Sequence, residues 1–451
     1  MIKRSGMAAG LLLVLGAIVA GRWIVPAFDL ATGYSAKQLC SGVFRSGLPA
    51  DYIIENDIHL SMAALGPLWP LLHTEVDVPA TRVRASLLGS SAVAVYTAPT
   101  MGCVLNPPDE AALPGYRPFD YEIIYEPDDP VMPSAAMAAV IDQAFLEPVS
   151  GQRHTQAVIV MHRGEIIAER YAAPVHGATP LQGWSMNKSL MATWVGMQVS
   201  EGALALTDSV RDAVHRVDPD LAGNIDPALN LGHLLHMESG FDFEETYLPG
   251  DDATQMLYRS PAMWRVAPGT GQRHAPGEHF NYSSGDTNLA AWLWTHSLQG
   301  EAYIRWIGSN FSGPLGLSPY AHERDASGIQ VGSSYSYMTA IGWARVGRFW
   351  LDAYHGRSEL LSQEWMQASV TPRPANTHGN YGRGFWLNTQ AYDFPELPRK
   401  LFYASGHNGQ YVAVFPDQEL VVVRLGLASS FELNGVAELL QGVLANLPGP
   451  D

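Results

Sequence analysis

Runs of apolar residues predict an antiparallel β-sheet at the centre of this chain. Residues 158–161 and 165–168 are apolar-rich and flank His162-Arg163-Gly164, a pattern typical of a β-hairpin whose glycine adopts a positive φ. Near the C-terminus, further strand-like runs occupy residues 401–403, 411–415 and 420–423. Together these runs predict a group of central antiparallel strands.

Helical spacing of apolar residues predicts helices around this sheet. Ser134 is a suitable N-cap for a helix over residues 135–145. A long helix is predicted over residues 335–354, where apolar residues recur on one side. Further helices are predicted over residues 231–237, 289–293 and 431–447. The predicted fold class is therefore α+β.

The first part of the chain is less regular. Prolines are frequent between residues 30 and 133, and only residues 93–97 are typical of a strand. We expect residues 29–133 to form an appendage that packs on a main domain over residues 134–451.

Residues 1–28 have the pattern of an export signal. Lys3 and Arg4 precede an uncharged apolar run over residues 7–21, the order of charged and apolar regions found in signal peptides. Apolar residues beyond Arg22 extend the run, and no clean cleavage site follows it. We therefore expect an exported protein, periplasmic or secreted, or one anchored to the membrane by this segment. A cleaved signal and a retained anchor both remain open.

Composition narrows the class of protein. The 451 residues are 47% hydrophobic and 16% charged, as in globular proteins. A formal net charge of -17, without clusters of Lys or Arg, argues against a nucleic-acid partner. Cys40 and Cys103 are the two cysteines. In an exported chain they could form a disulfide, and the alternative is two separate buried thiols.

The candidate chemistry is centred on Ser185 and Lys188. The lysine follows the serine by three residues at the start of an apolar run, so both side chains should lie on one face of a helix's first turn. A serine hydroxyl becomes a good nucleophile when a base takes its proton. A lysine is such a base where burial or a neighbouring cation lowers its pKa.

Other segments carry residues suited to the same chemistry. Tyr282 follows a tight turn at Pro276-Gly277, where it could present its hydroxyl to a serine, and a neighbouring ammonium would favour its phenolate form. Residues 405–410 lie between two predicted strands, where a backbone N–H can face a developing oxyanion. Trp386, in an aromatic and glycine-rich segment, either lines an acyl pocket or belongs to the core.

Three short motifs, taken in chain order, resemble the plan of the serine β-lactamase and penicillin-binding-protein superfamily: Ser185-x-x-Lys188, Tyr282-Ser283-Ser284 and His407-Asn408-Gly409. The most similar branch is the class C and esterase-like one, which includes 6-aminohexanoate-dimer hydrolases. Residues 231–240 and 276–283 resemble further elements of that branch. The resemblance covers residues 134–447. It implies a β-lactamase/transpeptidase-like fold, with an antiparallel sheet flanked by helices and a helical subdomain.

The resemblance also implies roles for individual residues. Ser185 would be the acylated nucleophile, Lys188 its base or proton relay, and Tyr282 the group that passes the proton to the leaving group and activates the deacylating water. The backbone N–H groups of Ser185 and Gln410 would form the oxyanion hole. Substrate contacts would come from Ser284, His407, Asn408, Gly409 and Trp386.

Two departures from the β-lactamase pattern bear on the substrate. Ser284 stands where β-lactamases of this type carry asparagine, and His407 stands where they carry the lysine of Lys-Thr-Gly, a cation suited to the β-lactam carboxylate. We therefore expect an exported serine hydrolase that forms an acyl-enzyme with a small ester or linear amide and needs no cofactor. It would be a carboxylesterase or a 6-aminohexanoate-oligomer-type amidase. The alternatives are a β-lactamase, a D-Ala-D-Ala peptidase or a catalytically silent sensor module.

Other hydrolase classes fit less well. No serine has the flanking glycines of the α/β-hydrolase Gly-x-Ser-x-Gly motif. His233, His236 and Glu238 do not have the spacing of a His-Glu-x-x-His zinc site, so we interpret the histidines as core residues and expect no metal. We interpret the acidic residues that follow, Glu245 among them, as a solvated run of charge.

Overall fold

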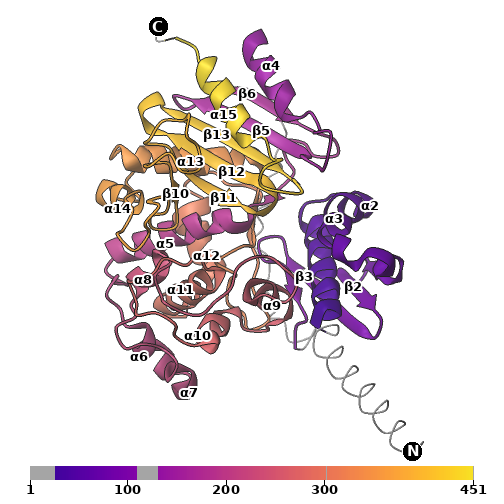
Figure 1. The fold of residues 1–451 in the computed structure, drawn as a ribbon, viewed down its shortest axis with the longest axis vertical. Coiled ribbons are helices and arrows are strands. Elements are labelled where there is room, and N and C mark those ends of the chain that lie inside the picture. Colours follow the sequence, from indigo (N-terminus) through magenta and orange to yellow (C-terminus); the bar gives the residue numbers. More distant parts are fainter. Residues whose placement is uncertain (1–25, 109–130, 301, 450–451) are drawn as a thin grey trace, which may run out of the picture.

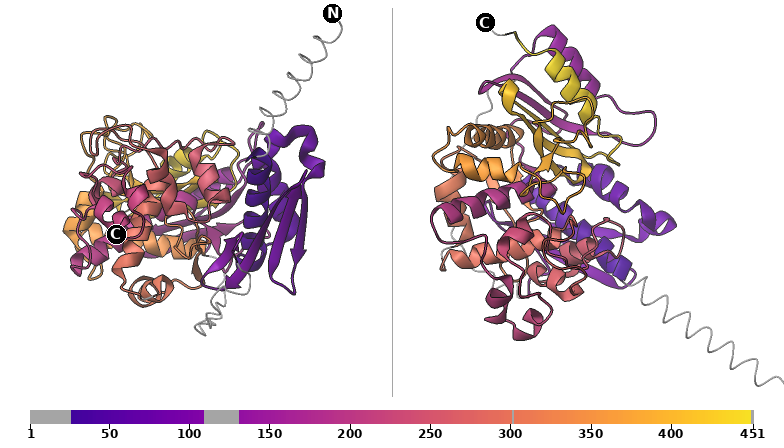
Figure 2. Two further views of the ribbon diagram at one scale, coloured as in Figure 1. Left: turned by 90° about the horizontal axis from the view of Figure 1, so that it is seen from below. Right: turned by 60° about the vertical axis from the view of Figure 1, so that its left-hand side comes forward.

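A computed structural model describes residues 26–108, 131–300 and 302–449 (Figure 1). Residues 131–449 form the larger body, and residues 26–108 form a smaller unit with its own sheet against one side of it (Figure 2). Most of the predicted signal or anchor, residues 1–28, lies outside the described residues. Within the described ranges, no helix has the length and apolar character needed to cross a membrane.

The central sheet has six strands in the order β10-β11-β12-β13-β5-β6, with every neighbouring pair antiparallel. The predicted hairpin is confirmed as β5 (Thr155–His162) and β6 (Glu165–Tyr171), joined by Arg163 and Gly164, which both have positive φ. The strands β5, β12 and β13 are buried along their whole length, which explains their continuous apolar runs. The remaining bounds are β10 (Trp386–Leu387), β11 (Phe402–Gly406), β12 (Gln410–Phe415) and β13 (Leu420–Gly426).

Helices cover both faces of this sheet. On one face, α4 (Ala135–Ala144) and α15 (Val436–Ala445) pack on strand residues such as Val160 and Val422. The predicted cap of α4 is confirmed, since Ser134 Oγ accepts a hydrogen bond from the Met137 N–H. On the other face lie α5 (Asn187–Ser200) and α13 (Ala340–Tyr354).

A helical region between α5 and α13 forms the predicted subdomain. Its helices are α6 (Val210–His215), α7 (Pro219–Ala222), α8 (Leu231–Leu235), α9 (Asp252–Arg259), α10 (Val266–Thr270), α11 (Ser284–Ser297) and α12 (Tyr303–Ile307). A small sheet of β7 (Leu181–Gln182), β9 (Ser336–Met338) and β8 (Tyr320–His322) borders this region. The helix α14 (Gln363–Ser369) follows α13.

The helices α13 and α15 begin later than predicted. The first part of residues 335–354 is the strand β9, and α13 begins only at Ala340 because Thr339 caps it, with Oγ1 accepting from the Gly342 N–H. The predicted C-terminal helix over residues 431–447 begins at Val436, because Gly435 has a φ of 70°, which lies outside the helical region.

The appendage is more regular than predicted. A helix over residues 26–40 continues as the π-helical Ser41–Arg45, and the short helical segments α2 (Ala50–Ile53), Ile54–Ile58, α3 (His59–Ser61) and Ala63–Leu71 follow. Four antiparallel strands come next, in the order β1 (His73–Asp77), β2 (Arg82–Leu87), β3 (Ser90–Ala98) and β4 (Gly102–Leu105). The prediction of an irregular segment is wrong because alanines carry much of the buried alternation in β2 and β3, and alanine is a weak strand signal.

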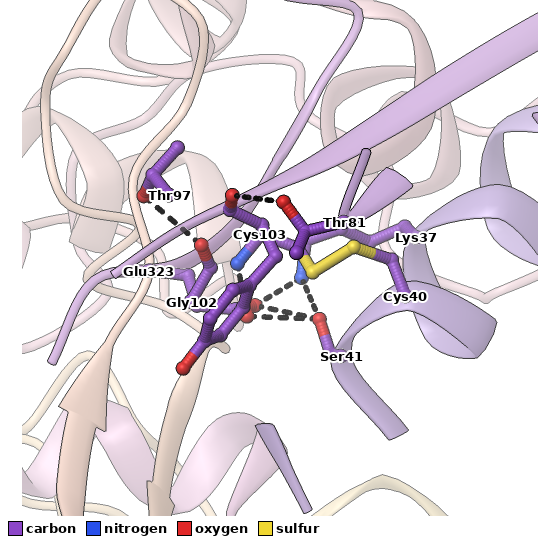
Figure 3. The surroundings of a disulfide bond; sticks show 9 residues. Lys37, Cys40, Ser41, Thr81, Thr97, Gly102, Cys103 and Glu323 are labelled. Atoms are coloured by element: carbon purple, nitrogen blue, oxygen red, sulfur yellow. Dashed lines mark hydrogen bonds and ion pairs between the residues drawn. A yellow bond between two sulfur atoms is a disulfide. The ribbon is translucent and has the colours of Figure 1, made fainter. Parts of the chain in front are cut away.

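The predicted disulfide between Cys40 and Cys103 is present, and it ties the helix of residues 26–40 to β4 (Figure 3).

Candidate active site

Ser185 lies in a short 3-10 turn that leads directly into α5. The turn spans Trp184–Met186, and α5 begins at Asn187. Trp184 has a φ of 49°, which is unusual for a large side chain and costs backbone energy. Because Trp184 is buried, packing of its indole holds the strained turn from which Ser185 projects.

Lys188 makes polar contacts with both Ser185 and Ser284. Its Nζ donates to Ser185 Oγ at 2.8 Å and to Ser284 Oγ at 2.8 Å. The same nitrogen lies 4.6 Å from the centre of the Tyr282 ring, over the ring face. The fold therefore brings together Ser185, Lys188, Tyr282 and Ser284, which the first two motifs had singled out.

Tyr282 enters the site just before α11, whose N-cap Ser283 accepts from the Asp286 N–H. Burial raises the pKa of the Tyr282 phenol well above its usual range, and the negative charge of Glu245 adds to the rise, whereas polar groups of Ser185 and Trp386 near the hydroxyl oppose it. This rise opposes the predicted phenolate. Lys188 lies over the face of the ring, and the raised pKa favours the neutral phenol.

Glu245 is a site residue that the sequence analysis missed. Its carboxylate accepts from the Ser284 backbone N–H and, at 2.8 Å, from Ser284 Oγ. Its Oε1 lies 3.6 Å from Lys188 Nζ, and its side chain is only 2% exposed. The interpretation of Glu245 as part of a solvated run is thus wrong. A signal was present, because the buried Phe241 and Phe243 alternate with exposed residues and so place Glu245 on the buried face of an extended segment.

Tyr247 and His407 stack against each other beside the serine turn. Their rings lie 4.7 Å apart with planes at 8°, and Trp184 contacts His407 edge-on at 5.1 Å. Burial raises the pKa of the Tyr247 phenol, with Glu245 adding to the rise, while Lys188 and Ser185 oppose it. Burial lowers the pKa of His407 to about 4. His407 is therefore an uncharged aromatic wall of the site at neutral pH, and Tyr247 is a second missed neighbour of Ser185.

The third motif meets the serine turn through Gly406, the last residue of β11. A methyl group at this position would lie 2.3 Å from the Gly183 carbonyl oxygen and 3.0 Å from Trp184 Cβ. The strand β11 can lie against the serine turn only because residue 406 has no side chain.

The residues after His407 have partners within the sheet. The carbonyl oxygens of Asn408 and Gly409 accept hydrogen bonds from Arg424 Nη1 at 3.1 and 2.7 Å. Gln410 begins β12, which lies between β11 and β13. Gln410 pairs with Gly406 of β11, the residue that lies against the serine turn.

Trp386 lies beside the catalytic candidates, in the edge strand β10. Its ring is 5.0 Å from that of Tyr282, and the buried Tyr381 ring is 5.7 Å from Tyr282 on an edge-to-face contact. Trp386 thus contacts Tyr282 directly.

The residues considered as zinc ligands have other partners. His233 completes a capping box with Asn230 at the start of α8. His236 Nδ1 is hydrogen-bonded to the Gly232 carbonyl at 2.7 Å, and Glu238 pairs with Arg373 at 3.1 Å. Across residues 26–108, 131–300 and 302–449, no group of three or more His, Cys, Asp or Glu is arranged to hold a metal ion.

Comparison with known proteins adds independent information. A family model described as Beta-lactamase matches residues 136–433. The 6-aminohexanoate-dimer hydrolase of Paenarthrobacter ureafaciens is 26% identical over 332 residues, which cover 66% of this chain and 79% of that protein.

Solved structures share the fold at low sequence identity. EstCE1, described as a hydrolase with promiscuous acyltransferase activity, superposes with a TM-score of 0.55 at 16% identity, covering 68% of this chain and 97% of its own. A D-stereospecific amidohydrolase from Streptomyces sp. gives a TM-score of 0.51 at 16% identity, covering 70% of this chain and 99% of its own.

Proposed function

The chain belongs to the beta-lactamase family, and on this premise we propose that Ser185 is the nucleophile of an acyl-enzyme mechanism that hydrolyses small esters or linear amides. The chain is a serine hydrolase, in keeping with relatives that are named as hydrolases. The 2.8 Å contact between Lys188 Nζ and Ser185 Oγ is the observation that carries the choice of nucleophile.

Glu245 offers a way to make Lys188 a base. The lysine donates to Ser284 Oγ, and Ser284 Oγ in turn donates to Glu245 Oε1 at 2.8 Å. Transfer of one proton along this path leaves a neutral amine on Lys188 and a neutral carboxyl on Glu245. The amine then takes the Ser185 proton as Oγ bonds to the substrate carbonyl carbon.

Tyr282 completes the proton transfers. Because its phenol is neutral, it holds a proton to give to the leaving alcohol or amine when the C–O or C–N bond breaks, and the Lys188 ammonium then replaces that proton. In deacylation the same groups take a proton from water and return it to Ser185 Oγ.

The oxyanion needs two backbone donors near Ser185. We assign the Ser185 N–H as one of them, as the resemblance implies. For the second we replace Gln410 with the N–H of His407, because His407 directly follows Gly406, the residue of β11 that lies against the serine turn. This assignment rests on the position of β11.

The substrate preference follows from the charge of the site. His407 stands where β-lactamases carry a lysine, and its lowered pKa of about 4 leaves it uncharged. It therefore offers no cation to the carboxylate of a β-lactam, while its ring and those of Tyr247 and Trp386 supply an apolar wall for an acyl chain. Esters and linear amides are favoured over penicillins for this reason.

The first test is labelling with a fluorophosphonate probe, followed by intact mass measurement and peptide mapping. We expect one adduct on Ser185 in the wild type and none in Ser185→Ala, with Ser200→Ala as the matched control because Ser200 is exposed at the end of α5. Hydrolysis of 4-nitrophenyl butyrate should fall by about 10³-fold or more in Ser185→Ala. An unlabelled but folded wild type would instead support the silent sensor module.

We also propose that the protein is exported. The charged and apolar order of residues 1–28 and the Cys40–Cys103 disulfide support this. Export can be tested by labelling fractionated cells with the same probe. The labelled chain should appear in the periplasmic, secreted or membrane fraction. A labelled chain confined to the cytosol would contradict export.

A further inference from the structure

A cavity of about 210 Å³ lies where the appendage meets the main domain. The appendage lines it with Arg45, at the end of the first helical segment, and with Pro99 and Thr100 from the turn between β3 and β4. The main domain lines it with residues from α12, from the segment that follows this helix and from the start of β8. Figure 2 shows these two units side by side. The cavity is separate from the site around Ser185, since it shares none of that site's residues.

Arg45 is a buried cation, and two of its guanidinium nitrogens have no hydrogen-bond partner. It is only 9% exposed, and its Nε and Nη2 are covered by protein yet have no hydrogen-bond acceptor among the described residues. Thr100 Oγ1, from the facing turn, is likewise buried and unpaired. Leaving a buried guanidinium without an acceptor or a counter-charge is costly. Because Nε and Nη2 are covered by protein, Nη1 is the guanidinium nitrogen that can face the cavity, where an acidic ligand would supply a counter-charge.

Glu323, the buried carboxylate whose charge acts on Arg45, already has other partners. Glu323 accepts from Lys37 Nζ, from Ser41 Oγ at 2.8 Å and from the Cys103 N–H at 2.7 Å (Figure 3). One carboxylate thus faces two cations, Lys37 and Arg45, and Lys37 holds it. Although the chain has 44 acidic and 27 basic residues, the cavity is lined by Arg45 and Arg305 and by no Asp or Glu.

The rest of the lining is suited to an apolar chain. Pro99, Ile304, Leu317 and Pro319 contribute apolar surface, and several glycines leave room between them. At about 30 Å³ per water molecule, the volume corresponds to roughly seven waters, which is the scale of a short alkyl chain.

We propose that this junction cavity binds a monocarboxylate with a short alkyl chain. The carboxylate pairs with the Arg45 guanidinium, in the charge-assisted geometry that arginine favours, and the chain lies among the prolines, Ile304 and Leu317. Since the two units each supply part of the lining, the ligand links them, and its binding stabilises the docked state of the appendage. The proposal is independent of the reaction at Ser185.

The test measures sodium hexanoate binding by calorimetry and thermal unfolding of the full chain, with sodium chloride matched for ionic strength. Hexanoate should raise the unfolding temperature of the wild type, whereas the neutral hexanamide should not. Arg45→Met should bind hexanoate at least about tenfold more weakly, because the charged hydrogen bonds are lost. Arg216→Met, which alters an exposed arginine at the C-cap of α6, should behave as the wild type.

A second variant covers the case in which Arg45→Met fails to fold. Gly308 lines the cavity, and a Cβ added there has nothing within 4 Å. Gly308→Leu should therefore fold, fill the space and exclude hexanoate while Arg45 stays in place. Equal binding of hexanoate and hexanamide, or undiminished binding by both variants, would overturn the proposal. The latter result would place the ligand elsewhere, such as the cleft at Ser185.

Discussion

At the scale of single residues, Glu245 provides a counter-charge for the lysine buried beside the proposed nucleophile. Lys188 and Glu245 are 1% and 2% exposed and lie 3.6 Å apart. A buried ammonium needs a nearby opposite charge. Because Ser284 bridges the two groups through its hydroxyl, the proposed mechanism uses the counter-charge as a proton acceptor for the lysine. Tyr282, by contrast, is kept neutral by burial and by that same carboxylate.

This arrangement predicts the effect of Glu245→Gln. The amide keeps a hydrogen-bond acceptor for Ser284 but cannot hold the lysine's proton, so kcat/KM for an ester should fall by about 10²-fold, within the range for loss of a general acid or base. The rate of fluorophosphonate labelling at Ser185 should fall with it. The control is Glu244→Gln, which changes the exposed neighbour. Wild-type kinetics in Glu245→Gln would show that Lys188 does not need this carboxylate.

At the scale of elements, the site is the meeting point of the serine turn, the start of α11 and the end of β11. The approach of β11 is the closest of these contacts, since it leaves no room for a Cβ at Gly406. Gly406 has a φ of -134°, an extended value open to any residue, so the restriction is steric rather than conformational.

Gly406→Ala therefore tests the position of β11. The added methyl group should push β11 away from Gly183 and move the His407 N–H out of the oxyanion hole, lowering kcat by about 10²-fold with a smaller change in KM. Gly269→Ala is the matched control, because a Cβ there meets nothing within 4 Å. An active Gly406→Ala enzyme with unchanged kcat would remove His407 from the proposed oxyanion hole.

At the scale of the whole molecule, the appendage is held to the main domain by a buried ion pair. Lys37 and Glu323 are 1% and 0% exposed, and Lys37 Nζ also lies 3.9 Å from the centre of the Tyr335 ring. Burial lowers the pKa of Lys37, while Glu323 opposes that shift. The pair therefore depends on both partners being present.

Lys37→Met should lower the free energy of unfolding by about 3–5 kcal/mol, since it leaves Glu323 charged and buried. Adding Glu323→Gln should recover much of that loss, because glutamine still accepts from Ser41 and Cys103. Urea unfolding of the wild type, the two single variants and the double variant gives the coupling energy between Lys37 and Glu323. The surface pair of Arg259 and Asp29, with side chains 36% and 33% exposed, is the comparison: Arg259→Met should cost no more than about 1 kcal/mol. Additive effects of Lys37→Met and Glu323→Gln would contradict the buried pair.

Local patterns in the sequence determined a large part of the fold. The hairpin of β5 and β6, the strands β11 to β13 and the cap at Ser134 all depend on residues close together in the chain. The spacing of Ser185 and Lys188 was informative for the same reason, because a helical turn alone brings them together. The strands of the appendage escaped prediction because alanines carry much of their alternation.

The tertiary structure alone decided which distant residues complete the site. In the sequence, Glu245 is one of several neighbouring acidic residues. Only the fold places it beside Ser284 and Lys188, which are 96 residues apart in the chain. Gly406 is one of several glycines in its segment, and only the fold places it against Gly183. Likewise, only the fold pairs Glu323 with Lys37 and leaves two nitrogens of the Arg45 guanidinium without a hydrogen bond. Spacing along the chain reports contacts within a helix or a hairpin. The burial of a side chain, its protonation state and the pairing of its charge depend on how separate elements pack. They are therefore properties of the folded molecule.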